Sequence, residues 1–339
     1  ILGQTVGHTN TCCVLERTLS LSVRWCHGRC SLLLCVCVCL FVLSVSMDLQ
    51  EAREQLWVGN YSKALSEAES LRHLSEQESA EQRILILRAH LGMGQYEMVK
   101  HEVSSSDSAE LRAVQLLASV LENPGIVEDP DVVSAALQLH EEKSDSPTVS
   151  LMVASALLHA GLLERAFKVA ASELSQELRA LLVHICVAMN RPDKAESCLM
   201  DMDEDTVLTQ LARAQVCLAQ GPTKAEEAVS LFRDLSLKFG DTVLLFNGMA
   251  TGKMIMGDFA GAEEILKKAM GLRNSDAETL INLAVCGQHL DWPQDVVARY
   301  INQLKLISPH HPWVKSYAAK EELFATSCGQ FRAEVSKSH

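Results

Sequence analysis

The sequence predicts an all-α fold in which antiparallel helix pairs stack into a solenoid, and three observations lead to that prediction. Of the 339 residues, 48% are hydrophobic but only 5% are aromatic, and 8 are proline; this composition is typical of closely packed helices. A glycine-containing turn recurs along the chain at nearly constant spacing. No stretch alternates polar and apolar residues for long enough to predict a sheet.

The recurring turn consists of a glycine, a polar or leucine residue and an aromatic or leucine side chain, followed by a small residue that opens the next helix. Glycine ends the preceding helix in a left-handed conformation without steric cost. The small residue allows the two helices to approach closely. The turn is found at Gly59 to Ala64, Gly94 to Val99, Gly161 to Ala166, and Gly257 to Ala262.

The spacing of the small residues identifies the repeat. Ala195, Ala228, Ala262 and Val296 follow one another at steps of 33, 34 and 34 residues. A helix–turn–helix unit of about 34 residues is the signature of the tetratricopeptide repeat. We therefore predict a tetratricopeptide-like α-solenoid of about eight helix pairs over residues 47–331, followed by a flexible tail over 332–339. Such a solenoid presents a long concave surface, which favours a protein-binding role over catalysis.

The first 46 residues carry no repeat pattern. They hold seven of the twelve cysteines, and the uncharged stretch 31–47 is similar to the core of a signal peptide and close to the lower length limit of a membrane span. The chain begins with Ile, and Met47 stands directly before the first helical pattern. We expect residues 1–46 to be an unstructured or spurious extension outside the fold; a genuine signal or anchor is the alternative.

Charge and side-chain chemistry argue against several classes of function. The net charge of −13 disfavours nucleic-acid binding, because an acidic surface repels phosphate. The five cysteines after residue 46 stand singly among apolar residues, as small hydrophobic side chains do. The segment Gly248 to Lys253 only approximates a phosphate-binding loop, and we expect it to serve packing. No catalytic, cofactor-binding or metal-binding residues are predicted.

Several segments resemble one protein family, the epsilon subunit of the coatomer vesicle coat. They include DMDEDTVLTQLARAQVCLAQG (201–221), LLFNG (244–248), ETLINL (278–283) and HPWVK (311–315). The resemblance implies a solenoid wrapped around the C-terminal domain of the coatomer alpha subunit. It also implies a cytoplasmic protein, peripheral on Golgi membranes and on vesicles of Golgi-to-ER and intra-Golgi transport. A generic tetratricopeptide adaptor or co-chaperone that binds a peptide segment is the alternative.

The repeat register also predicts a binding groove. In tetratricopeptide proteins the groove is lined by the second, fifth, ninth, twelfth and thirteenth positions of the first helix of each pair. Several of these positions are large and apolar here, which indicates an interface, and we expect it to exceed about 2,000 Å² in total. The predicted groove residues are Leu151, Ser155, Leu158, His159, Leu244, Asn247, Thr251, Met254, Ile281, Val285, Gln288 and His289.

Overall fold

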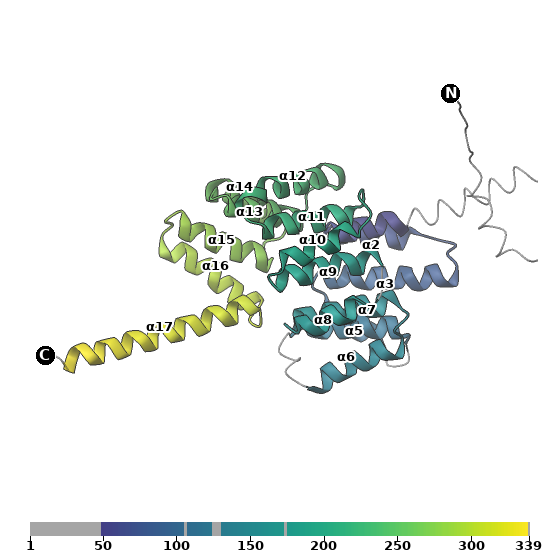
Figure 1. Ribbon diagram of the computed structural model, residues 1–339, viewed down its shortest axis with the longest axis horizontal. Helices are drawn as coiled ribbons and strands as arrows, with labels where there is room; N and C mark the ends of the chain where they lie inside the picture. Colours follow the sequence, from purple (N-terminus) through teal and green to yellow (C-terminus); the bar gives the residue numbers. More distant parts are fainter. Residues whose placement is uncertain (1–48, 105–106, 124–129, 173–174, 338–339) are drawn as a thin grey trace, which may run out of the picture. The chain divides into compact units, whose positions relative to one another are not determined.

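The computed structural model describes residues 49–104, 107–123, 130–172 and 175–337, and all of them belong to one compact unit, Met47–His339 (Figure 1). The prediction for residues 1–46 lies outside the described residues. Within the described ranges the chain forms helices and connecting turns, and no strand. The predicted all-α class is confirmed.

The helices follow one another as antiparallel pairs. A first helix over residues 49–57 pairs with the one after it, and each later odd-numbered helix pairs with the next even-numbered one up to α16. In the described residues this makes eight pairs, followed by α17, as predicted. The bounds are α2 (Tyr61–Ser70), α3 (Glu76–Gly92), α4 (Tyr96–Glu102), α5 (Ala109–Glu122), α6 (Pro130–Glu142), α7 (Pro147–His159), α8 (Leu163–Ala170), α9 (Gln176–Ala188), α10 (Pro192–Met200), α11 (Val207–Ala219), α12 (Pro222–Phe239), α13 (Val243–Ile255), α14 (Phe259–Leu272), α15 (Ala277–His289), α16 (Gln294–Ile307) and α17 (Pro312–Lys337).

Local sequence explains where these helices begin and end. At α3 the Ser75 side chain accepts from the backbone of Glu78, and the Glu78 carboxylate accepts from Ser75, which completes a capping box. Thr242 and Asp276 cap α13 and α15 in the simpler one-way form. The turn glycines have φ between +77° and +84°, for example at Gly59 and Gly161, which is the left-handed conformation that the pattern predicted.

The core runs along the stack as a series of apolar clusters between neighbouring pairs. The small residues that set the repeat are central to it, because Ala166, Ala195, Ala228 and Ala262 are fully buried. Each lies where the second helix of a pair meets its partners. The 34-residue period is therefore the period of close helix contact.

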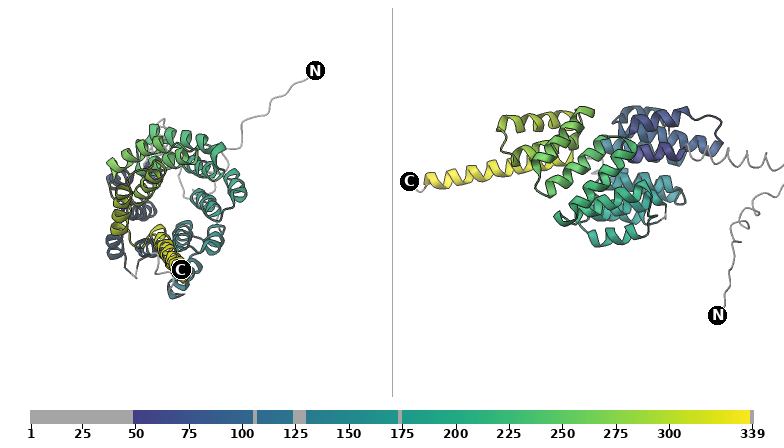
Figure 2. Two further views of the ribbon diagram at one scale, coloured as in Figure 1. Left: turned by 90° about the vertical axis from the view of Figure 1, so that its left-hand side faces the viewer. Right: turned by 90° about the horizontal axis from the view of Figure 1, so that it is seen from above.

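The stack curves until its first pair meets later pairs, so that the helices of this unit form a ring in the end-on view (Figure 2, left). The Thr242 hydroxyl at the start of α13 donates to the carbonyl of Val58 at 2.7 Å. The guanidinium of Arg273, after α14, donates to the carbonyl of Gly92 at 3.2 Å. We call this line of contact, where the turns after the first helix and after α3 meet α13 and α14, the seam.

Two details of the fold concern membranes and the C-terminus. Among the helices that the structure describes, none is both long and apolar enough to cross a bilayer. The last helix, α17, continues to Lys337, so most of the segment 332–339, for which a flexible tail was predicted, is helical. Residues 332–337 contain neither glycine nor proline, and they extend the helix without interruption.

Candidate partner-binding surface

All twelve predicted groove residues lie on first helices of their pairs: four on α7, four on α13 and four on α15. Their exposure differs widely. Leu151 and Ile281 are buried, whereas His159, Leu244, Gln288 and His289 are exposed. The half-buried remainder are Ser155, Leu158, Asn247, Thr251, Met254 and Val285.

On α7 the predicted residues divide between core and surface. Leu151 belongs to the large N-terminal core cluster, and Leu158 packs against that cluster. His159, by contrast, reaches solvent. Its pKa is lowered, first because the surrounding protein desolvates the imidazolium and then because His184 lies nearby. His159 is therefore a neutral, polar side chain on an accessible surface.

On α13 the side chains take part in a polar network that joins this helix to α15. The Asn247 amide donates to Thr279 at 2.9 Å and to Asp276 at 3.2 Å, while its oxygen accepts from Asn282 at 3.1 Å. The Thr251 hydroxyl donates to the Asn247 carbonyl at 2.8 Å. These contacts hold the polar groups of two neighbouring repeats in a fixed arrangement.

On α15 two predicted residues are occupied by contacts within the chain. Ile281 shares a cluster with Val314 at the base of α17. The His289 ring stacks on Phe259 with centroids 3.9 Å apart. Gln288 remains exposed. Of the predicted residues on α15, Gln288 is thus an exposed one that belongs to neither contact.

Two first helices of the same surface, α9 and α11, lie between α7 and α13. The predicted set of twelve includes no residue from either helix, although the sequence also allows His184 on α9 to face the groove. His184 on α9 and Gln215 on α11 occupy the ninth helix position and contact each other at 3.3 Å. The signal was present in the sequence, because counting back from Ala195 and Ala228 gives the register of both helices. Together α7, α9, α11, α13 and α15 form the candidate surface, which we call the concave surface.

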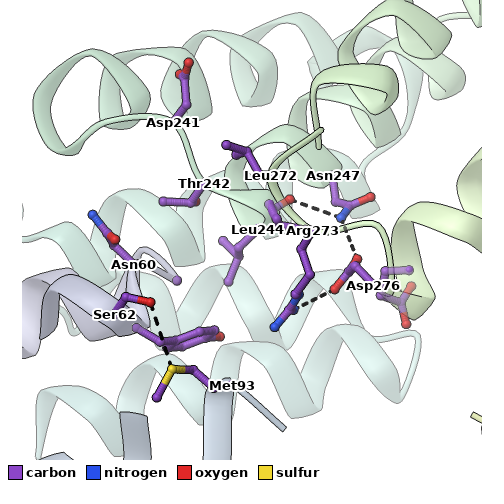
Figure 3. A pocket seen from close by; sticks show the side chains of 14 residues that line it. Asn60, Ser62, Met93, Asp241, Thr242, Leu244, Asn247, Leu272, Arg273 and Asp276 are labelled. Carbon is purple, nitrogen blue, oxygen red and sulfur yellow. Dashed lines mark hydrogen bonds and ion pairs between the residues drawn. The ribbon is translucent and has the colours of Figure 1, made fainter. Parts of the chain in front are cut away.

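The seam borders an open cavity of about 550 Å³, and Figure 3 shows its lining. Two predicted groove residues, Leu244 and Asn247, border it, so the cavity is continuous with the concave surface. The lining combines apolar side chains with three carboxylates and one guanidinium. Its residues are Gly59, Asn60, Tyr61, Ser62, Met93, Asp241, Thr242, Val243, Leu244, Asn247, Leu272, Arg273, Asp276 and Glu278.

The charged groups of this cavity are already paired in part. Arg273 donates to Asp276 at 2.7 Å, and the same carboxylate group caps α15 through the backbone of Thr279 at 3.0 Å. The Tyr61 ring packs so closely over Gly92 that a Cβ there would lie 2.3 Å from the ring. Burial raises the pKa of Tyr61, so its hydroxyl stays protonated. The cavity thus combines a paired guanidinium and carboxylate with a protonated phenol.

A second contact across the ring joins the first two pairs to α9. The Arg88 guanidinium donates to both oxygens of Glu177, at 2.6 and 3.2 Å, and the Trp57 indole donates to the same carboxylate at 2.6 Å. Burial opposes the charge of Glu177, but the Arg88 charge and these hydrogen bonds outweigh it and lower the pKa of the carboxyl group. We call Trp57, Arg88 and Glu177 the clasp.

The described residues contain no group of three or more His, Cys, Asp or Glu side chains that could hold a metal ion. The buried cysteines behave as small apolar groups, since burial raises the pKa of the Cys286 thiol to about 11. What the ring offers is an accessible, mixed polar and apolar inner surface with a cavity along one side.

Comparison with solved structures defines the class of the fold. A tetratricopeptide repeat protein from Parabacteroides merdae superposes with a TM-score of 0.52 at 13% identity, covering 81% of this chain and 97% of that one. At this identity the likeness concerns the fold alone. The chain is a tetratricopeptide-like α-solenoid.

Comparison of sequences defines the family. The family model for the coatomer epsilon subunit matches residues 45–332. Coatomer subunit epsilon-1 of Arabidopsis thaliana is 36% identical over 288 residues, covering 82% of this chain and 95% of the relative. Coatomer subunit epsilon of Caenorhabditis elegans is 30% identical over 285 residues, covering 83% and 97%. The chain belongs to the coatomer epsilon subunit family and is thus a component of a vesicle coat.

Proposed function

We propose that this chain is a non-catalytic structural subunit of the coatomer that binds the C-terminal domain of the alpha subunit. Through that domain it joins the coat on the cytosolic face of Golgi membranes and vesicles, in retrograde Golgi-to-ER and intra-Golgi transport. The observation that carries the proposal is the accessible concave surface in a chain of the coatomer epsilon family. The family supplies the assembly, and the concave surface supplies side chains from several repeats for a partner to contact.

The binding site that we propose consists of the concave surface together with the cavity at the seam. His159 and Gln288 mark the exposed ends of α7 and α15. Leu244 connects the surface to the cavity. Because a partner there would contact several repeats at once, we expect it to bury more than about 2,000 Å² and to dissociate slowly.

The test is to place negative charge on exposed positions of this surface. Leu158 and Met254 pack against core clusters, so a charge at either would disturb folding as well as binding. A double variant, His159→Glu with Gln288→Glu, should fold normally because both side chains reach solvent. We expect it to bind the purified C-terminal domain of the alpha subunit at least about tenfold more weakly by titration calorimetry.

The control is Lys168→Glu, an exposed charge change on α8, the second helix of its pair, which should leave the affinity unchanged. Circular dichroism checks that all variants keep their helical content. If the double variant binds the alpha-subunit domain as tightly as the wild-type chain, the concave surface is not the binding site. If the wild-type chain does not bind that domain, the proposed partner is wrong, and a role as a peptide-binding adaptor becomes the better hypothesis.

A further inference from the structure

The last helix, α17, is attached to the solenoid only at its base. Val314 is buried with Ile281 and Leu304, and Trp313 packs against the same cluster. Tyr317 stacks on Trp313 with centroids 5.1 Å apart. From residue 318 to residue 331 nearly every side chain is exposed. In Figure 1 and in the right panel of Figure 2 the helix extends away from the other helices of the unit.

The projecting part carries large apolar side chains in water. Leu323, Phe324 and Phe331 are exposed to 67%, 72% and 67%. Residues seven apart lie on nearly the same side of an α-helix, so Phe324 and Phe331 continue the line that begins at Tyr317. That side of the helix is the one that packs against the solenoid at the base of α17. An apolar stripe that starts in the core therefore runs on into solvent.

Tertiary packing within the described chain does not cover these apolar side chains. Exposed apolar patches on proteins usually mark contact sites. Phe324, Cys328 and Phe331 have the i, i+4, i+7 spacing with which a helix lies in the apolar groove of another protein. The spacing of the stripe is that of a helix that binds in such a groove.

The position of α17 points to the partner that occupies the concave surface. Its base packs on Ile281, which is itself a position of that surface on α15. In the end-on view α17 lies within the outline of the ring (Figure 2, left), and in the view from above it runs outward from it (Figure 2, right). A domain that is held inside the ring and extends out of it would therefore run along α17.

A second copy of the chain is a poorer occupant. The projecting residues 318–337 form a rod of only about 30 Å. Pairing of two such rods would bury little of the area that a stable dimer needs.

We propose that α17 is a second docking element for the partner bound by the concave surface, and that Phe324, Cys328 and Phe331 insert into an apolar groove on that partner. This inference rests on the proposed function, since it takes the C-terminal domain of the alpha subunit as the partner. It adds a contact that lies outside the tetratricopeptide groove. The two contacts together account for a helix whose apolar side chains would otherwise face water.

The experiment uses the full chain with Phe324→Ala and Phe331→Ala combined. The side chains are exposed, so the solenoid should keep its melting temperature. The affinity for the purified alpha-subunit domain should fall at least about tenfold by titration calorimetry. The matched control combines Glu322→Ala and Thr326→Ala, two exposed substitutions on the opposite side of the same helix, and it should bind like the wild-type chain.

The outcomes separate this inference from the proposed function. If the wild-type chain binds the alpha-subunit domain and the phenylalanine variant binds it equally well, α17 is not a docking element, although the proposed function stands. If the wild-type chain does not bind that domain, both fail. If light scattering shows a dimer of the wild-type chain that the phenylalanine variant loses, the stripe pairs with a second copy and the proposal is overturned.

Discussion

At the scale of single residues, side-chain volume at the helix crossings governs how the repeats fit together. Ala262 is fully buried and shares a cluster with Leu266, Leu283 and Cys286. With Ala250 of α13 in the same cluster, three helices meet at this point, so a single larger residue at position 262 would push on all of them. Packing is what requires alanine at this position. Helix propensity alone does not, because several larger residues favour a helix nearly as well.

Replacing Ala262 with leucine should therefore lower the free energy of unfolding by about 1–3 kcal/mol, because extra methylenes in a filled site force neighbouring side chains out of their rotamers. Urea unfolding measures the change. Ala260→Leu is the control, since Ala260 lies two residues away on the same helix and is exposed. Equal unfolding midpoints for the two variants would mean that the crossing at Ala262 is looser than the structure indicates.

At the scale of helices, glycines inside α13 allow that helix to lie close against α12. A Cβ at Gly248 would lie 2.6 Å from the Phe232 ring, and one at Gly252 would lie 2.5 Å from a methyl of Val229. The carbonyl of Ala225 would be 3.2 Å from the same Cβ. The segment that approximates a phosphate-binding loop thus lies within a helix and is used for packing, as its sequence suggested.

The close contact of Gly252 with α12 predicts that Gly252→Ala changes stability in the direction opposite to that expected from helix propensity. Alanine favours helix by about 1 kcal/mol over glycine, yet the variant should be destabilised by about 1–3 kcal/mol because Val229 and a backbone carbonyl cannot both move aside. In Gly271→Ala, the matched control on α14, the new methyl meets no atom within 4 Å, so that variant should gain up to about 1 kcal/mol. Thermal unfolding compares them, and a stabilised Gly252→Ala would contradict the close crossing.

At the scale of the whole unit, the clasp and the seam join segments that are far apart in the chain. Trp57 and Glu177 are separated by 120 residues, and Thr242 and Val58 by 184. Tetratricopeptide stacks gain most of their stability from neighbouring repeats. These contacts add a longer-range contribution, because breaking one should loosen the first pair from the later pairs and open the ring.

The clasp should give the stability of the ring a specific dependence on pH. The pKa of Glu177 is lowered in the folded chain, so its contribution is present above the unfolded pKa of about 4.3 and is lost as pH falls through the folded value. Glu177→Gln should reduce the free energy of unfolding at pH 7 by about 1.5–3 kcal/mol, as for a hydrogen-bonded charged group. This difference from the wild-type chain should shrink below about pH 4.

Urea titrations at several pH values measure that difference directly. Glu164→Gln on α8 serves as the control; Glu164 is exposed, and its variant should stay within about 0.5 kcal/mol of the wild-type chain at each pH. A Glu177→Gln variant whose deficit persists unchanged at low pH would show that the ionised carboxylate is not what stabilises the clasp.

Much of this organisation was accessible from sequence, because a helix pair is a local object. The turn glycines, the buried alanines and the 34-residue period are all set within one repeat, so reading along the chain gave the all-α class, the pair count and the helix positions of the twelve groove residues. It did not give the exposure of each side chain within the predicted groove. Burial of Ile281 by Val314 and stacking of His289 on Phe259 depend on which other helices pack against α15.

The sequence by itself determined the repeat, its register and the family to which the chain belongs. Only the tertiary structure decided that the stack closes into a ring, that Trp57 and Arg88 meet Glu177, and that α17 projects with Phe324 exposed. The physical reason is that curvature accumulates from small rotations between successive repeats. Those rotations depend on packing over many residues. The repeat pattern of the sequence therefore does not predict which distant segments the accumulated rotation brings into contact.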